Sequence, residues 1–237
     1  MNPEAGKALA FFAAAGLLGT AALLLGPRVL GLAAGPEGQI LTLLKNAEEE
    51  EPLAVPIPGS AEPLVKEALL YQRIVVDVSP EERIAEATAT VDFEGRLGKT
   101  HVASLGLERV RFVWREGEWV PVEGWLPTLA AIVAKLEARR QALEALDLPR
   151  LEALAGGSPG AAAGLGDAPE WALLRQMSPR RYRVTAWYIR LERDEVLVSE
   201  DFRIVGETPD RPVDEKGTRR LLLKGDGREF FFASGLM

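Results

Sequence analysis

VRFVWREGEWVPV, residues 110–122, and RLLLKGDGREFFFA, residues 220–233, are the two stretches that decide the fold. Each indicates an apolar strand, a tight turn with glycine and charged residues, and a second strand with aromatic residues, which is the pattern of a β-hairpin. Both belong to a longer correspondence at an offset near 111 positions. The matched residues are Tyr71, Gly117, Trp119, Gly124 and Trp125 in one copy and Tyr182, Gly227, Phe230, Gly235 and Leu236 in the other. The correspondence predicts a structural unit that is used twice.

Composition excludes several classes of protein. The chain has 237 residues, a net charge of −7 and no cysteine. Its length allows one or two domains, and the repeat favours two. The negative charge argues against a nucleic-acid partner, because phosphate binding needs a concentrated basic face. The absence of cysteine removes disulfides, thiolate metal sites, a cysteine nucleophile and a lipid-modified cysteine, and it leaves either side of a bacterial membrane open.

Residues 8–26, ALAFFAAAGLLGTAALLLG, predict a membrane helix, because Thr20 is the only polar side chain among them. At 1.5 Å per residue the run would be roughly 28 Å long, close to the thickness of a bilayer core. A cleaved signal peptide is the alternative, with Lys7 before the run and a small-x-small pattern at residues 31–33. We expect residues 1–34 to form an uncleaved anchor. Charge counting places the amino terminus in the cytoplasm and the rest outside a bacterial inner membrane.

The rest of the chain predicts an α+β fold in three segments. Residues 35–59 indicate a short helix and a proline-rich linker, and residues 60–125 indicate a first unit. In that unit a short helix is expected to start at Ser60, with Leu64, Val65, Ala68 and Leu69 on its buried side. Alternating residues then predict antiparallel strands at 73–78, 84–93, 100–104, 108–114 and 119–122.

Residues 126–237 predict a second unit of the same kind. Helical spacing of leucines covers residues 126–154, where Pro149 is expected to divide two helices, and a further helix is expected at 169–177. Strands are predicted at 182–191, 196–205, 218–224 and 229–233. Both units should therefore form curved antiparallel sheets that pack against helices.

Two segments of the second unit are RRQALEALD, residues 139–147, in its first predicted helix, and GREFFFASG, residues 227–235, around its last predicted strand. They resemble the opening helix and the last strand of the NTF2-like superfamily, also described as SnoaL-like or cystatin-related cone folds. The resemblance covers residues 126–237 and extends more loosely over 39–125. It implies two tandem cones behind a membrane helix, which is similar to inner-membrane assembly factors of bacterial secretion and conjugation systems. It also implies that catalytic members of the family would carry a carboxylate or a histidine in the mouth of the cone.

Few residues are candidates for catalysis. His101 is the only histidine, and it stands at a predicted strand start where an exposed imidazole is ordinary. Asp201 and Asp92 lie on predicted strands, and either could act as a general base if it faced a cone interior. Alternation with Val91 and Phe93 places Asp92 toward solvent. We therefore assign no catalytic residue, and we expect no metal site and no cofactor.

Residues 182–191 predict an interface, because both faces of this strand are apolar. Tyr182, Trp187, Tyr188 and Ile189 are the interface candidates. One face should pack on helices, and the other should need the first copy or a second chain as a partner. The aromatic residues could alternatively line a pocket for a small apolar ligand.

Two functions remain open. The first is a membrane-anchored, non-catalytic binding or assembly module in an envelope complex, with a protein partner or a homo-oligomer. The alternative is a ketosteroid-isomerase-like or dehydratase-like enzyme, or a carrier of apolar small molecules, on the same fold.

Overall fold

The computed structural model describes residues 35–79, 81, 83–156, 166, 168–192, 195–225 and 229–236. The predicted membrane run at residues 8–26 lies outside these residues. Among the helices of the described part, none is both long and apolar enough to cross a membrane.

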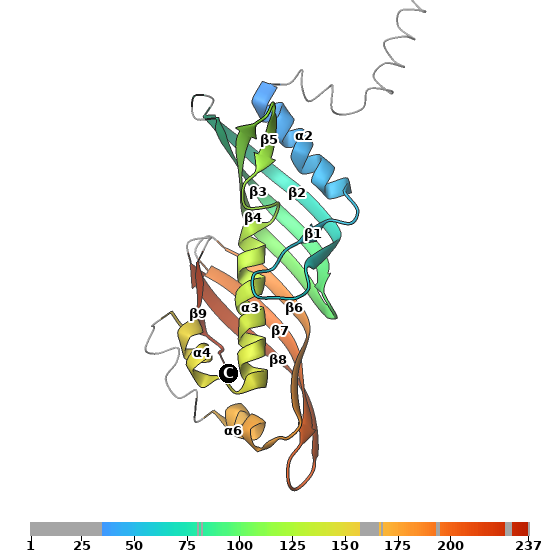
Figure 1. Ribbon diagram of the computed structural model, residues 1–237, viewed down its shortest axis with the longest axis vertical. Coiled ribbons are helices and arrows are strands. Elements are labelled where there is room, and N and C mark those ends of the chain that lie inside the picture. Colours follow the sequence, from blue (N-terminus) through green and yellow to red (C-terminus); the bar gives the residue numbers. More distant parts are fainter. Residues whose placement is uncertain are drawn as a thin grey trace, which may run out of the picture.

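The described chain is α+β, with a few helices and a large curved sheet (Figure 1). Its helices are α2 (Gly35–Glu49), α3 (Pro127–Ala145), α4 (Leu148–Leu154) and α6 (Pro169–Gln176). The strands that precede α3 are β1 (Ala54–Val55), β2 (Leu64–Ser79), β3 (Ile84–Leu97), β4 (Thr100–Arg115) and β5 (Glu118–Pro121). The strands that follow α6 are β6 (Arg180–Leu191), β7 (Glu195–Glu207), β8 (Pro212–Gly225) and β9 (Phe230–Ser234).

All these strands belong to one sheet. Its order is β1-β2-β3-β4-β6-β7-β8-β9, and β5 pairs with β4. Neighbours are antiparallel except β4 and β6, which run parallel. Helices α2 and α3 lie over the same face of this sheet in Figure 1. We call that face the inner face and the opposite one the outer face.

Strand β4 joins the two parts of the sheet, because the edge that does not pair with β3 has two different partners. Residues 101–106 pair with residues 186–191 of β6, whereas residues 112–115 pair with β5. Gly106 lies where the partner changes. Its φ is +151°, and a β-carbon at this position would stand 2.3 Å from the carbonyl oxygen of Leu191. Only glycine lets the two backbones approach this closely.

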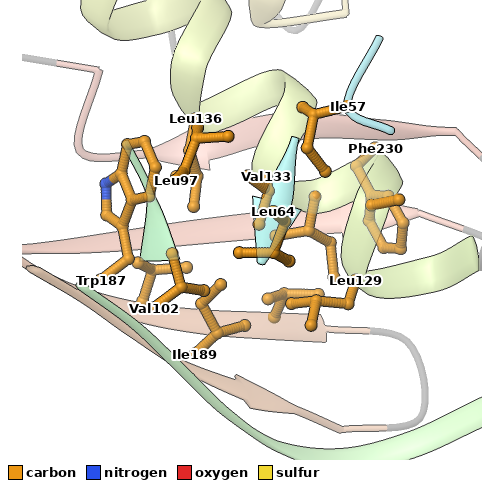
Figure 2. Close-up of a cluster of buried hydrophobic side chains, with 14 of the residues drawn as sticks. Ile57, Leu64, Leu97, Val102, Leu129, Val133, Leu136, Trp187, Ile189 and Phe230 are labelled. Atoms are coloured by element: carbon orange, nitrogen blue, oxygen red, sulfur yellow. The ribbon is translucent and has the colours of Figure 1, made fainter. Parts of the chain in front are cut away.

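Helix α3 covers this junction on the inner face. It packs against both β4 and β6 as well as β9. Figure 2 shows Trp187 and Val102, from the two sides of the junction, in one cluster with Leu136 of α3. The buried hydroxyl of Thr100 also donates a hydrogen bond of 3.0 Å to the carbonyl oxygen of Val184. The apolar core therefore continues from one half of the chain into the other.

The helix expected to start at Ser60 is wrong. Residues 64–79 form β2, a long strand with two register irregularities against β3. The prediction failed because a bulge in β2 shifts the alternation of inward and outward side chains. Adjacent apolar residues such as Leu69 and Leu70 then resemble the apolar face of a helix. The predicted strands 100–104 and 108–114 are likewise one strand, β4, with Gly106 between the two predicted ranges.

The other expectations for regular structure are confirmed within a few residues. The helical run divides as expected near Pro149, which lies in the first turn of α4, and Asp147 before it accepts a hydrogen bond of 3.0 Å from the backbone N–H of Arg150. This aspartate caps the start of α4. The β6, β7 and β9 strands lie within two residues of their predicted ranges, whereas β8 begins at Pro212, six residues before the predicted start at 218.

Candidate functional site

The three candidates for catalysis lie on the outer face and do not form a site. Asp92 is exposed on β3. His101 is half-buried and contacts the ring of Tyr188 edge-on at 6.0 Å. Asp201 accepts a hydrogen bond of 2.6 Å from the hydroxyl of Thr218.

His101 and Asp201 occupy the same register level, with Ala186 of β6 between them. That arrangement separates their α-carbons by two strand spacings, roughly 10 Å. A nucleophile–base or acid–base pair needs hydrogen-bond reach, so this pair is not arranged for general acid–base chemistry.

The four interface candidates divide between the two faces. Tyr182, Trp187 and Ile189 are buried on the inner face, where Trp187 has no exposed surface. Tyr188 stands on the outer face and is 48% exposed. The inner side of β6 is therefore covered within this chain, and the outer side of Tyr188 is open.

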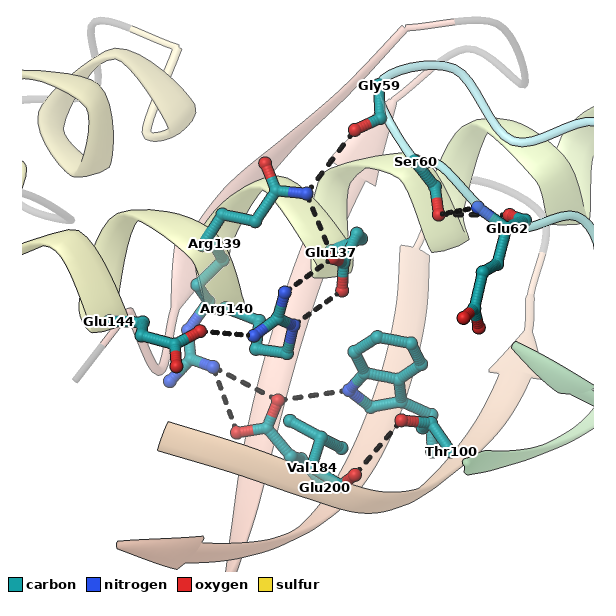
Figure 3. Close-up of polar contacts among 12 residues, drawn as sticks. Gly59, Ser60, Glu62, Thr100, Glu137, Arg139, Arg140, Glu144, Val184 and Glu200 are labelled. Atoms are coloured by element: carbon teal, nitrogen blue, oxygen red, sulfur yellow. Dashed lines mark hydrogen bonds and ion pairs between the residues drawn. The ribbon is translucent and has the colours of Figure 1, made fainter. Parts of the chain in front are cut away.

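The inner face carries a buried ion pair between Arg139 of α3 and Glu200 of β7 (Figure 3). Both side chains are fully buried. The Nη1 of Arg139 lies 2.9 Å and 3.1 Å from the two carboxylate oxygens of Glu200. Its Nε donates to the backbone carbonyl of Leu236 at 3.0 Å. The pair thus connects the helix, the middle of the sheet and the carboxyl-terminal residues.

Two further donors complete the environment of Glu200. The Tyr182 hydroxyl donates to one carboxylate oxygen at 2.7 Å, and the Trp187 Nε1–H donates to the other at 3.0 Å. Burial by itself would raise the pKa of Glu200, but Arg139 and these hydrogen bonds together hold the pKa below its usual value. Glu200 is therefore an ionised carboxylate at neutral pH, and each of its two oxygens accepts two hydrogen bonds from within the chain.

A second buried carboxylate, Glu108 of β4, lies under the start of α3. Its oxygens accept the backbone N–H groups of Thr128 and Leu129 at 3.1 Å and 2.7 Å. Burial raises its pKa to about 7, although these hydrogen bonds lower it. Glu108 thus caps the helix from the sheet, because the first N–H groups of a helix have no partner within it.

Tyr71 of β2, the counterpart of Tyr182 in the first half of the chain, is also held by a hydrogen bond on the inner face. The hydroxyl of Tyr71 donates to the carbonyl oxygen of Trp125 at 2.9 Å, just before α3 begins. Burial, with the nearby charges of Glu108 and Glu48, raises the pKa of Tyr71 well above its usual range. The hydroxyl therefore stays protonated and serves as a structural donor.

A pocket of about 230 Å³ lies apart from these carboxylates, at the start of α2. It is lined by Pro36, Gln39, Arg83, Trp114 and Trp119. Its volume is below the roughly 300–1,000 Å³ of pockets that hold drug-sized ligands. No acid or histidine contributes to it, so it offers a cation and aromatic rings but no proton-transfer group.

Sequence reasoning missed Arg139, Glu200 and Glu108, although the signal was present. Glu200 follows Val196 and Val198 at spacings of two, so strand alternation places it on the buried side. The same alternation places Glu108 with Val110, and helical spacing places Arg139 with Leu136. A charged residue at an apolar position of each pattern was the available signal.

The described residues contain no group of three or more histidine, cysteine, aspartate or glutamate side chains that could hold a metal ion. Arg139 and Glu200 instead bond to each other, and Glu108 accepts backbone N–H groups at the start of α3. The arrangement can stabilise and orient α3 on the sheet.

No family model and no curated protein matches this chain. Solved structures to which it is similar include an NTF2-like protein involved in plasmid conjugation, at 11% identity and a TM-score of 0.32, with 71% of this chain and 75% of that chain covered. Another is Bd1075 of Bdellovibrio bacteriovorus, at 12% identity and a TM-score of 0.35, with 74% and 76% covered. Similarity at this level concerns the general arrangement of the chain and carries no functional argument.

Proposed function

We propose that this protein is a non-catalytic binding or assembly module, made of two NTF2-like units in tandem and held at the bacterial inner membrane by its amino-terminal segment. The observation that carries this proposal is the buried pair of Arg139 and Glu200. These side chains, with Tyr182 and Trp187, occupy the space between helix and sheet where a cone would otherwise admit a substrate. A site for chemistry would need that space open to a substrate.

The order of elements supports the tandem arrangement. A run of four strands, β2 to β5, follows α2 and the two-residue strand β1, and a second run of four, β6 to β9, follows α3, α4 and α6. Each run ends in a hairpin with a short last strand. Tyr71 and Tyr182 stand on the inner face of the first strand of each run, and Trp119 and Phe230 stand in the last.

The proposal is tested by ligand binding. We expect a panel of apolar ring compounds, including steroids, to leave the melting temperature of the full chain unchanged. A reproducible increase of several degrees with any of them, lost in Trp119→Ala or Trp187→Phe, would overturn the proposed module in favour of the alternative, a small-molecule carrier or an isomerase-like enzyme.

The membrane location has its own test. The intact chain, produced in a bacterium, should sediment with membranes and resist extraction by alkali and by salt, because burial of residues 8–26 rather than surface charge would hold it. A mature chain that begins near Ala34, found by mass spectrometry in the soluble fraction, would show a cleaved signal peptide instead.

A further inference from the structure

The outer face carries a row of side chains at one register level across six neighbouring strands. Pairing links each member of the row to the next, from β2 through β3, β4, β6 and β7 to β8. The members, in order, are Leu70, Asp92, Leu105, Arg190, Leu197 and Leu222. Parallel pairing of β4 with β6 brings the two halves of the chain into this single row.

On each side of Leu105 the row continues with a charged residue and then a leucine, and the two charges are opposite in sign. An acid, Asp92, stands on one side of Leu105 and a base, Arg190, on the other. Beyond them lie Leu70 and Leu197. The three leucines are between 44% and 51% exposed, which is unusual for large apolar side chains at the centre of a wide sheet.

The charges in the row are available to a partner. The side chain of Asp92 has no hydrogen bond or ion pair with any residue that the structure describes. Arg190 makes one exposed ion pair, 3.3 Å from Glu192, and an exposed pair of this kind exchanges readily for another. Helices α2 and α3 lie over the inner face, so they do not cover this row.

We propose that a second copy of this chain packs on the outer face, related by a two-fold axis that passes over Leu105 and runs along the strands. Such an axis reverses the row. It places Asp92 of each copy against Arg190 of the other, and Leu70 against Leu197, while the two Leu105 side chains meet at the centre. An interface of this type is self-complementary, as two-fold dimers require.

The geometry suits sheets, because the mean strand directions of two packed sheets stay within about 30° of each other. From Leu70 to Leu197 the row crosses four strand spacings, roughly 19 Å. Leu107 and Tyr188 add exposed apolar surface at adjacent levels. A contact made by one row and the side chains beside it is small for a specific interface, so we expect a dimer that dissociates on dilution.

The proposed membrane location fits this axis, and only this step of the inference rests on the proposed function. A two-fold axis along the strands keeps Gly35 of both copies at the same end of the dimer. Two chains held in one membrane need that arrangement. Tethering both copies to a membrane would also raise their effective concentration, which compensates for a small interface.

The charge pattern gives a test that only self-association can pass. We expect Asp92→Arg and Arg190→Asp each to weaken the dimer at least about tenfold, because each homodimer then contains two contacts between like charges. Mixing the two variants should restore association, since both cross-contacts in the mixed dimer again pair opposite charges. Sedimentation of the full chain in mild detergent measures the mass, and Glu152→Arg, on the exposed side of α4, is the matched control.

Cysteine cross-linking locates the axis, and the chain has no natural cysteine to interfere. Leu105→Cys should form a disulfide-linked dimer under mild oxidation, whereas Glu152→Cys should not. Unchanged mass in both charge variants, or no recovery on mixing, would overturn the proposal. A strictly monomeric wild type that still sediments with membranes would overturn this dimer while leaving the proposed module in place. Binding of the row to residues 1–34 of the same chain would appear as that monomeric outcome.

Discussion

Replacing Arg139 by methionine should destabilise the chain strongly, because it leaves the carboxylate of Glu200 buried without its cation. Arg139 is fully buried and bonds to both oxygens of that carboxylate. The remaining donors, from Tyr182 and Trp187, are neutral groups and do not compensate a full charge. Breaking one partner of a buried ion pair costs about 3–5 kcal/mol, a large fraction of the roughly 5–15 kcal/mol that stabilises a typical domain.

The assay is urea unfolding of the full chain in mild detergent, followed by tryptophan fluorescence. Glu200→Gln removes the opposite partner and should cost a similar amount, because it leaves the guanidinium buried. The double variant should be no less stable than either single variant, since it buries no unpaired charge. A loss below about 1 kcal/mol for Arg139→Met, or losses that simply add in the double variant, would refute the reasoning.

The same pair predicts how acid acts on the protein. Because the folded-state pKa of Glu200 is lowered, the stability that it contributes is fully present above its unfolded-state value and is lost as pH falls through the folded-state value. In Arg139→Met the loss of stability at low pH should weaken or reverse, because burial then raises the pKa of Glu200 without the guanidinium that lowers it.

Three further changes test other parts of the structure. The wild type should lose up to about 3 kcal/mol of unfolding free energy between pH 5 and pH 8, because the raised pKa of about 7 makes ionisation of Glu108 costly only in the folded state. Glu108→Gln should abolish this pH dependence. Glu94→Gln, at an exposed site, should leave it intact when unfolding is measured across the same range. Gly106→Ala should cost about 2 kcal/mol or more, because its β-carbon would overlap a carbonyl oxygen of β6, and an unchanged melting temperature would show that the junction can shift. Trp187→Asp should prevent stable folding, whereas Tyr188→Asp on the outer face should change monomer stability by only about 0.5 kcal/mol, as circular dichroism during heating can compare.

The sequence was sufficient where local patterns carry the information. Alternation predicted β3 and β6–β9, and Pro149 predicted the division between α3 and α4, because side-chain direction and proline geometry depend on near neighbours in the chain. It failed at β2, where a bulge breaks the alternation. The outward direction of Asp92 was also readable from alternation alone.

The position of the buried charges was only half determined by the sequence. Alternation and helical spacing place Glu200 and Arg139 on buried sides, yet nothing local indicates that they face each other across α3 and the sheet. Their partnership depends on how a helix packs over strands that follow it far along the chain. The lowered pKa of Glu200 has the same origin.

The tertiary structure alone decided that the two halves share one sheet. The parallel pairing that sets His101 beside Ala186 joins segments separated by α3, α4 and α6, and no turn or short loop fixes its register. Long-range pairing of this kind is selected by the total burial under α3 and by the close approach at Gly106, which are properties of the assembled core. The row on the outer face exists for the same reason, since its acid and its base come from different halves and become neighbours of Leu105 only when β4 and β6 meet.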